Sequence, residues 1–179
     1  QEIERAVECL LDLRLSQGPR VEEFQKKYSE YIGTDFGVAV NSGSSANLIA
    51  LAALVKSGMV KKGSEVIIPA TTFTTVVSPI IQNGLIPVFV DVDRDTYNIS
   101  VTEIEKAIND NTGLIMPVHT LGLSADMDGI MKLANKYNLP VLEDCCEAHG
   151  ASINGKRVGS FGDISAYSFF VAHNMTTGE

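Results

Sequence analysis

Small hydroxyl residues gather where an extended run, 37–40, leads into a helical pattern. The stretch Asn41–Asn47, which reads NSGSSAN, places serine hydroxyls and backbone N–H groups at the amino terminus of that helix. Because unpaired amides and the helix dipole both favour an anion there, we predict a phosphate site at the carboxyl edge of a sheet. An ordinary turn with a serine N-cap remains the alternative. The stretch matches neither GxGxxG nor GxxxxGKS/T, which disfavours a Rossmann dinucleotide site and a Walker phosphate site.

Carboxylates follow a second apolar run, which ends in the sequence VLEDCCE. Asp144 lies at the predicted carboxyl end of this strand, where it could pair with a cationic ring nitrogen, and a capping or turn carboxylate is the alternative. Cys145 and Cys146 are adjacent and have no CxxC or Cys/His partner spacing. We therefore interpret them as small buried residues and predict no metal site.

A single histidine, His173, directly follows the strand-like run 168–172. This is a position from which a strand could display a catalytic side chain, and imidazole exchanges protons near neutral pH. A hydrogen-bonded structural histidine is the alternative for this residue taken alone.

A further acidic group, Asp91-Val-Asp93-Arg-Asp95, has the opening spacing of a calcium loop. The sixth position of such a loop is glycine and the twelfth is glutamate, whereas this sequence has threonine at both. We therefore predict solvated turn carboxylates that lead into a helix capped at Ser100 or Thr102.

Alternating helical and β-branched patterns must position these groups. The expected helices are 2–13, 20–31, 45–57, 74–83, 102–108 and 127–137, and the expected strands are 37–40, 65–68, 87–90, 114–118 and 141–143. Strand–helix alternation with short connections predicts a three-layer α/β domain with a mostly parallel sheet. Two later runs, 148–153 and 164–170, lie too close together for a crossover helix, so we expect them to add antiparallel strands.

The composition sets limits on the function. The chain has 179 residues, 45% of them hydrophobic, which is enough for one domain with a substantial core. Its net charge of −8 and the absence of a basic run disfavour nucleic-acid binding. Apolar runs are far shorter than the roughly 18 residues that span a membrane, and the amino terminus does not read as a signal peptide. We predict a cytoplasmic protein without membrane contact, and we expect its three cysteines to be reduced thiols.

Taken together and in this order, these motifs resemble the DegT/DnrJ/EryC1/StrS family of sugar aminotransferases, which use pyridoxal 5′-phosphate (PLP). The resemblance covers essentially the whole chain and is carried by the stretches Gln17-Gly18-Pro19, Asn41–Asn47, 84–93, Pro117-Val118-His119, Glu143-Asp144 and 155–163. It implies the αβα large domain of the aspartate aminotransferase-like architecture, fold type I. Residues 1–179 would then be an N-terminal part that includes most of the PLP-binding large domain, truncated before the small C-terminal domain, and the full-length protein would be a homodimer.

The resemblance also implies a role for individual residues. The cofactor phosphate would lie in a cradle of Gly43, Ser44 and Ser45, with a further hydroxyl from Ser168. Phe73 would stack on the pyridine ring, and Asp144 would keep the ring nitrogen protonated so that the ring acts as an electron sink.

Two departures from the aminotransferase pattern carry the functional prediction. His173 occupies the position at which aminotransferases of this family have the Schiff-base lysine, and Glu147, also predicted to contact the cofactor, replaces their glutamine. Imidazole cannot form a Schiff base. In both positions the chain resembles an offshoot of the family that removes the 3-hydroxyl from nucleotide-linked 4-keto-6-deoxyhexoses. Some members of that offshoot hold an iron–sulfur cluster, whose cysteines would lie beyond Glu179.

The predicted reaction uses the amine form of the cofactor, pyridoxamine 5′-phosphate (PMP), with His173 as the base and an amino donor such as glutamate or a reductase partner. It would serve deoxysugar and lipopolysaccharide O-antigen biosynthesis on a GDP- or CDP-linked sugar. One alternative is a PLP-dependent aminotransferase of the same family, including a degenerate relative that binds cofactor without dehydrating. A second is a non-catalytic α/β domain whose phosphate turn binds a nucleotide.

Overall fold

The computed structural model describes residues 1–13 and 16–177. The chain divides into two compact units, Gln1–Ala39 and Val40–Glu179. The first unit holds α1 (Glu2–Leu11) and α2 (Pro19–Ile32), close to their predicted ranges. Proline at the start of α2 and left-handed Gly33 at its end (φ 91°) are favourable boundary residues. The assignment of residues 1–179 to part of a larger domain stays a prediction.

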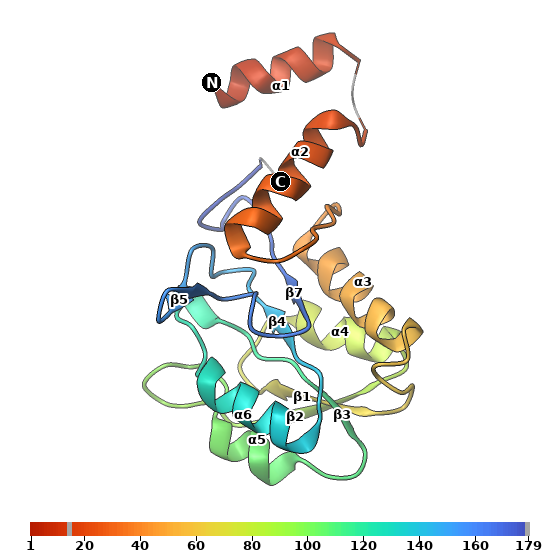
Figure 1. Cartoon of the computed structure of the whole chain (residues 1–179), viewed down its shortest axis with the longest axis vertical. Coiled ribbons are helices and arrows are strands. Elements are labelled where there is room, and N and C mark those ends of the chain that lie inside the picture. The colour runs from red at the N-terminus through yellow and green to blue at the C-terminus, as the bar shows by residue number, and fades with distance from the viewer. Residues whose placement is uncertain (14–15, 178–179) are drawn as a thin grey trace. The chain divides into compact units, whose positions relative to one another are not determined.

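The second unit alternates helices and strands (Figure 1). Its elements are α3 (Gly43–Lys56), β1 (Glu65–Pro69), α4 (Thr74–Gln82), β2 (Ile86–Val90), α5 (Val101–Ala107), β3 (Thr112–Ile115), η1 (Thr120–Gly122), α6 (Met127–Tyr137), β4 (Leu142–Asp144), β5 (Ser152–Ile153), β6 (Lys156–Arg157) and β7 (Ile164–Ala166). β1 pairs in parallel with β2 and β3, and β4 pairs in parallel with β7. Parallel bridges from Ile115 to Val141 and from Val118 to Asp144 link these two groups. The predicted mostly parallel sheet is confirmed.

Helices cover both faces of this sheet. Val66 and Ile68 of β1 belong to a buried cluster with residues of α3 and α4, whereas Ile67 belongs to a second cluster with residues of α5 and α6. Successive side chains of a strand point to opposite faces, so the two clusters lie on opposite sides of β1. The predicted three-layer arrangement is therefore confirmed, and it explains why β1 is almost continuously apolar.

Residues 37–40 were expected to form a strand, and this prediction is wrong. Their backbone pairs with glutamine side chains instead of a neighbouring strand: the Ala39 N–H donates to Gln25 Oε1 at 2.8 Å, and Gln17 Nε2 donates to the Ala39 carbonyl at 3.4 Å. Val38 is 78% exposed, so its β-branched side chain does not mark a buried strand.

The late strands differ from expectation in direction. β5 and β6 form an antiparallel hairpin, as expected for the run 148–153, but β7 is parallel to β4. A parallel connection needs about a dozen residues or more, usually as a helix. Here residues 145–163 make the connection with a loop and the short hairpin, so the absence of a predicted helix did not prevent parallel pairing.

The turn at Asp93 has the structure predicted for it. Asp93 Oδ1 accepts the N–H groups of Asp95 and Thr96, each at 3.0 Å, and these hydrogen bonds lower the pKa of the carboxyl. Ser100 is the N-cap of α5, with its side chain accepting the Glu103 N–H. The acidic group is therefore a solvated turn rather than a calcium loop.

The three cysteines, Cys9, Cys145 and Cys146, are free thiols, as predicted. Across residues 1–13 and 16–177, no helix is both long and apolar enough to cross a bilayer.

Candidate active site

The amino terminus of α3 has the geometry of an anion site. Ser42 is the N-cap, and its Oγ accepts the Ser45 N–H at 3.2 Å. The first intrahelical bond runs from the Ala46 N–H to the Ser42 carbonyl at 2.9 Å. The amides of Gly43 and Ser44 precede that bond, so they point out of the helix end, where they can meet a ligand.

Gly43 makes a close approach that only glycine permits. A Cβ at this position would lie 2.6 Å from Ser168 Cβ and 2.9 Å from Cys146 Sγ. Ser168 is 5% exposed, and its Oγ accepts the Phe170 N–H at 3.3 Å. The structure thus brings together two predicted cradle residues, Gly43 and Ser168, from distant parts of the sequence. Ser45 is half-buried and Ser44 exposed on the same helical turn.

Asp144 ends β4 and is 4% exposed. Both carboxylate oxygens accept hydrogen bonds: Oδ1 from the Cys146 N–H at 3.0 Å, and Oδ2 from Asn47 Nδ2 at 2.8 Å. A carboxylate oxygen can accept more than one donor, so Asp144 can still receive another N–H. Asn47 was not singled out from the sequence, although it lies one helical turn after Gly43.

His173 offers an unpartnered ring nitrogen. Its Nδ1 is buried and has no hydrogen-bond partner in the described residues. The backbone N–H of His173 donates to the Phe170 carbonyl at 2.9 Å, and the two rings meet edge to face with centroids 5.7 Å apart. β7 ends at Ala166, so His173 lies in a later turn and not directly after a strand as expected. A buried polar atom without a partner is uncommon, and its presence here suits contact with a ligand.

His149 holds the backbone of Ser168, in the segment that leads to His173, and was given no role from the sequence. Its Nε2 donates to the Ser168 carbonyl at 2.6 Å, and its ring lies against Phe169 with centroids 4.9 Å apart. Burial lowers the pKa of His149, the hydrogen bond to Ser168 opposes that change, and the nearby His173 adds to it. His149 thereby links the loop after β4 to the backbone of the predicted phosphate cradle.

Glu147 ties two segments together. Its Oε2 accepts the N–H of Leu121, a residue with a left-handed conformation (φ 53°) in η1. Its backbone carbonyl accepts Asn174 Nδ2 at 3.3 Å, beside His173. The predicted contact between Glu147 and a cofactor stays a prediction.

Phe73 precedes α4, on the loop that follows β1. Phe73 is 73% exposed, which leaves the faces of its ring available for stacking. The adjacent Thr72 carries a buried Oγ1 without a partner in the described residues. Stacking of Phe73 on a cofactor stays a prediction.

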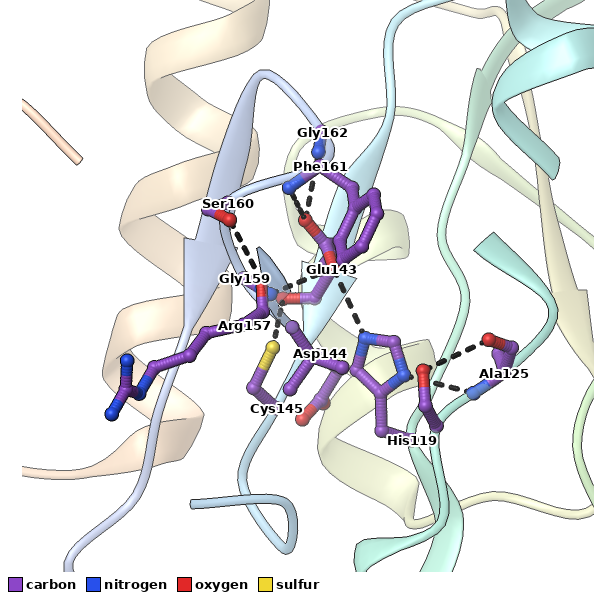
Figure 2. Close-up of polar contacts among 12 residues, drawn as sticks. His119, Ala125, Glu143, Asp144, Cys145, Arg157, Gly159, Ser160, Phe161 and Gly162 are labelled. Atoms are coloured by element: carbon purple, nitrogen blue, oxygen red, sulfur yellow. Dashed lines mark hydrogen bonds and ion pairs between the residues drawn. The ribbon is translucent and has the colours of Figure 1, made fainter. Parts of the chain in front are cut away.

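A buried histidine–glutamate pair supports the strand that carries Asp144 (Figure 2). His119 and Glu143 are both fully buried, and their Nε2 and Oε2 atoms are 3.2 Å apart. The Ala125 N–H donates to His119 Nδ1 at 3.1 Å, so the ring proton lies on Nε2, which donates to Glu143. From the sequence, His119 was noted only as part of a resembling stretch, because its hydrogen-bond partner Glu143 is 24 residues away.

Glu143 also holds the loop that precedes β7. Its two carboxylate oxygens accept the backbone N–H groups of Gly159, Phe161 and Gly162 at 2.7 to 2.8 Å. Burial raises the pKa of the Glu143 carboxyl, but the hydrogen bonds from His119 and the loop amides outweigh burial, and the pKa is lowered. The Glu143 carboxylate thus stabilises the loop before β7 and the end of β4, next to Asp144.

Ligand atoms of His119, Glu143 and Cys145 lie within 4.8 Å of one another, as a metal site would require. The Glu143 carboxylate already accepts hydrogen bonds from four N–H groups, and His119 Nδ1 accepts one from the Ala125 N–H. Burial raises the pKa of the Cys145 thiol well above its usual range. A metal ion needs deprotonated ligands with free lone pairs. The cluster is therefore better described as a hydrogen-bond network.

Comparison with known proteins gives consistent matches along the chain. The family model described as "DegT/DnrJ/EryC1/StrS aminotransferase family" matches residues 1–179. Lipopolysaccharide biosynthesis protein RfbH of Salmonella typhimurium is 46% identical over 100% of this chain and 42% of its own length.

Two solved structures superpose on nearly the whole chain. The aminotransferase from Psychrobacter cryohalolentis has a TM-score of 0.93 at 38% identity, covering 99% of this chain and 44% of its own. The E. coli GDP-4-keto-6-deoxy-D-mannose-3-dehydratase with bound hydrated PLP has a TM-score of 0.92 at 36% identity, covering 98% of this chain and 46% of its own. The chain therefore spans less than half the length of each of these relatives.

Proposed function

Because the chain belongs to the DegT/DnrJ/EryC1/StrS aminotransferase family, we propose that it is the N-terminal part of a PLP-dependent enzyme that removes the 3-hydroxyl of a nucleotide-linked 4-keto-6-deoxyhexose. The predicted fold class, the αβα architecture of PLP-dependent fold type I, is confirmed by the two superpositions. The observation that carries the proposal is His173, which resemblance places at the lysine position of the aminotransferases. An imidazole there can move a proton but cannot form a Schiff base.

The residues present fit such a cofactor at both of its ends. At the phosphate end, Gly43 packs closely against Ser168, so the free amides at the start of α3 lie beside a buried hydroxyl. At the ring-nitrogen end, Asp144 is a buried carboxylate with acceptor capacity to spare. His173 adds a buried ring nitrogen without a protein partner in the described residues.

Each residue then has a separate task. When bound, the cofactor in its amine form supplies an electron sink that stabilises charge left by a departing proton. The Gly43 and Ser44 amides, with the Ser45 and Ser168 hydroxyls, would hold the phosphate. Phe73 would cover one face of the ring and exclude water from it.

Asp144 and His173 would carry the proton chemistry. Asp144 would keep a proton on the ring nitrogen through a charge-assisted hydrogen bond. His173 would accept a proton at Nδ1 and return it to the hydroxyl that leaves C3 as water. Imidazole is a common general base and general acid in enzymes, so one side chain can both accept the proton and return it.

Transamination is the second candidate, and similarity to the Psychrobacter aminotransferase supports it. That reaction in this family uses a lysine, and the resemblance places His173 at the position of that lysine. Dehydration is therefore favoured. Similarity to a lipopolysaccharide biosynthesis protein supports a role in the synthesis of such a polysaccharide, for which the proposed product would be a deoxysugar. We also propose glutamate or a reductase partner as co-reactant and a cytoplasmic homodimer as the working form.

Cofactor binding without a covalent link tests this proposal. The full-length protein, titrated with PLP, is expected to show saturable absorbance changes, because the α3 amides and Asp144 capture the cofactor. Borohydride reduction followed by peptide mass spectrometry is expected to find no stoichiometric pyridoxyl-lysine, since imidazole replaces the lysine amine. One pyridoxyl group per chain on a single lysine would contradict the proposal, and so would the absence of saturable binding.

A further inference from the structure

Asn47 is a fully buried amide side chain on α3 that none of the roles described above uses. Its Nδ2 donates to Asp144 Oδ2 at 2.8 Å and lies 3.4 Å from the Thr75 carbonyl oxygen. Its Oδ1 is buried and has no hydrogen-bond partner in the described residues. Both groups near Nδ2 are acceptors, so the nitrogen must face them and the orientation of the amide is determined.

An apolar side chain could fill the space that Asn47 occupies. The buried positions that follow it on α3, Ala50, Leu51 and Leu54, are apolar and belong to the core cluster between α3 and the sheet. An unpaired buried carbonyl is destabilising, and leucine, of similar size, would avoid that cost. The feature that leucine could not supply is the N–H group directed at Asp144.

Asn47 also links the two ends of the proposed cofactor site. It follows Gly43 by four residues, so both lie on one face of α3, one turn apart. Gly43 packs on Ser168 and Cys146, while Asn47 holds the carboxylate whose other oxygen accepts the Cys146 N–H. The helix that presents amides to the phosphate therefore also sets the orientation of Asp144.

We infer that Asn47 is a positioning residue that holds the Asp144 carboxylate in the orientation needed to bind the protonated ring nitrogen of the cofactor. This inference rests on the proposed function. Asn47 acts through Asp144, whose carboxylate plane is fixed by donors on both oxygens. Without the Asn47 donor, Oδ2 loses its hydrogen bond, the carboxylate keeps only its contacts to Cys146, and it can rotate.

A comparison of two ligands isolates this role. One ligand is PLP, and the other is its carbocyclic analogue, in which C–H replaces the ring nitrogen. The ratio of their dissociation constants reports the contact between Asp144 and the ring nitrogen, because the phosphate contacts are common to both. In the full-length protein with Asn47→Leu, we expect this preference for PLP to fall by about tenfold, the size expected for misplacing one charge-assisted hydrogen bond.

Asn83→Leu is the matched control. Asn83 is a half-buried amide that caps α4 and donates to the carbonyls of Pro79 and Leu48, the second of which lies on α3. Its removal is expected to lower the melting temperature while leaving the ligand preference unchanged. Asn47→Ala provides a second variant that cannot overpack the site, and it should lose the preference as Asn47→Leu does.

The outcomes separate the inference from the proposed function. A wild-type protein that binds neither ligand, or binds both equally, would contradict the proposed function. A wild-type preference that persists in both Asn47 variants would overturn the inference alone. Equal weakening of both ligands, or loss of the folded state in both variants, would show that Asn47 is only structural and would overturn it as well.

Discussion

Replacing Asp144 with asparagine is expected to lower turnover by several orders of magnitude while the protein still captures the cofactor. Asparagine has the same shape but no charge, so it cannot hold a proton on the ring nitrogen, and the ring would lose its function as an electron sink. The phosphate contacts at Gly43 and Ser168 do not depend on that charge. Turnover and the dissociation constant of PLP, measured on the same preparation, check the two parts of this expectation.

Asp163→Asn is a suitable control for Asp144→Asn. The Asp163 carboxylate accepts the N–H of Val141, the residue directly before β4, at 2.9 Å. Its replacement should change the melting temperature without a comparable loss of turnover. If Asp144→Asn simply unfolds the protein, or if both variants lose activity equally, Asp144 is a structural carboxylate.

Changing His173 to lysine is expected to exchange one reaction for another. A lysine amine can bond covalently to the aldehyde form of the cofactor, so borohydride reduction should now find a pyridoxyl group on this residue. Dehydration should fall because a protonated or covalently held amine is a poor base at neutral pH. The measurement follows 3-deoxy ketosugar and aminosugar products side by side in the full-length protein.

His173→Gln separates the two effects of that change. Glutamine offers neither a base nor an amine, so dehydration should fall without a covalent link or a gain in aminosugar. Undiminished dehydration in His173→Lys would show that His173 is not the proton-transfer residue. The hydrogen-bonded structural role would then be the better account of this side chain.

Sequence signals correctly predicted the helices whose capping residues lie directly beside them in the sequence. The expected helix 127–137 coincides with α6, because the Asp126 side chain accepts the Gly129 N–H at one end and Asn138 adopts the left-handed conformation at the other. Residues 37–40 have the composition of a strand but lack a strand partner, and composition does not reveal where a backbone finds its hydrogen bonds. The direction of β7 likewise depends on how a long loop crosses the sheet.

The same distinction applies to the candidate site. Gly43, Asp144 and His173 were predictable because each carries a recognisable chemistry at the end of a run of regular pattern. Asn47 was missed because its role depends on a partner 97 residues away, and an asparagine within a helix has no signature of its own. Glu143 and His119 were quoted only as parts of resembling stretches, since four segments must meet before their network exists.

Product analysis tests the central claim most directly, namely that histidine in place of lysine gives dehydration rather than amine transfer. The full-length protein would be incubated with PLP, glutamate and a nucleotide-linked 4-keto-6-deoxyhexose, and the sugar product identified by mass spectrometry and NMR. We expect a ketosugar that has lost the oxygen at C3 and gained no nitrogen. A product that retains the C3 hydroxyl and carries an amino group at C4 would contradict the claim.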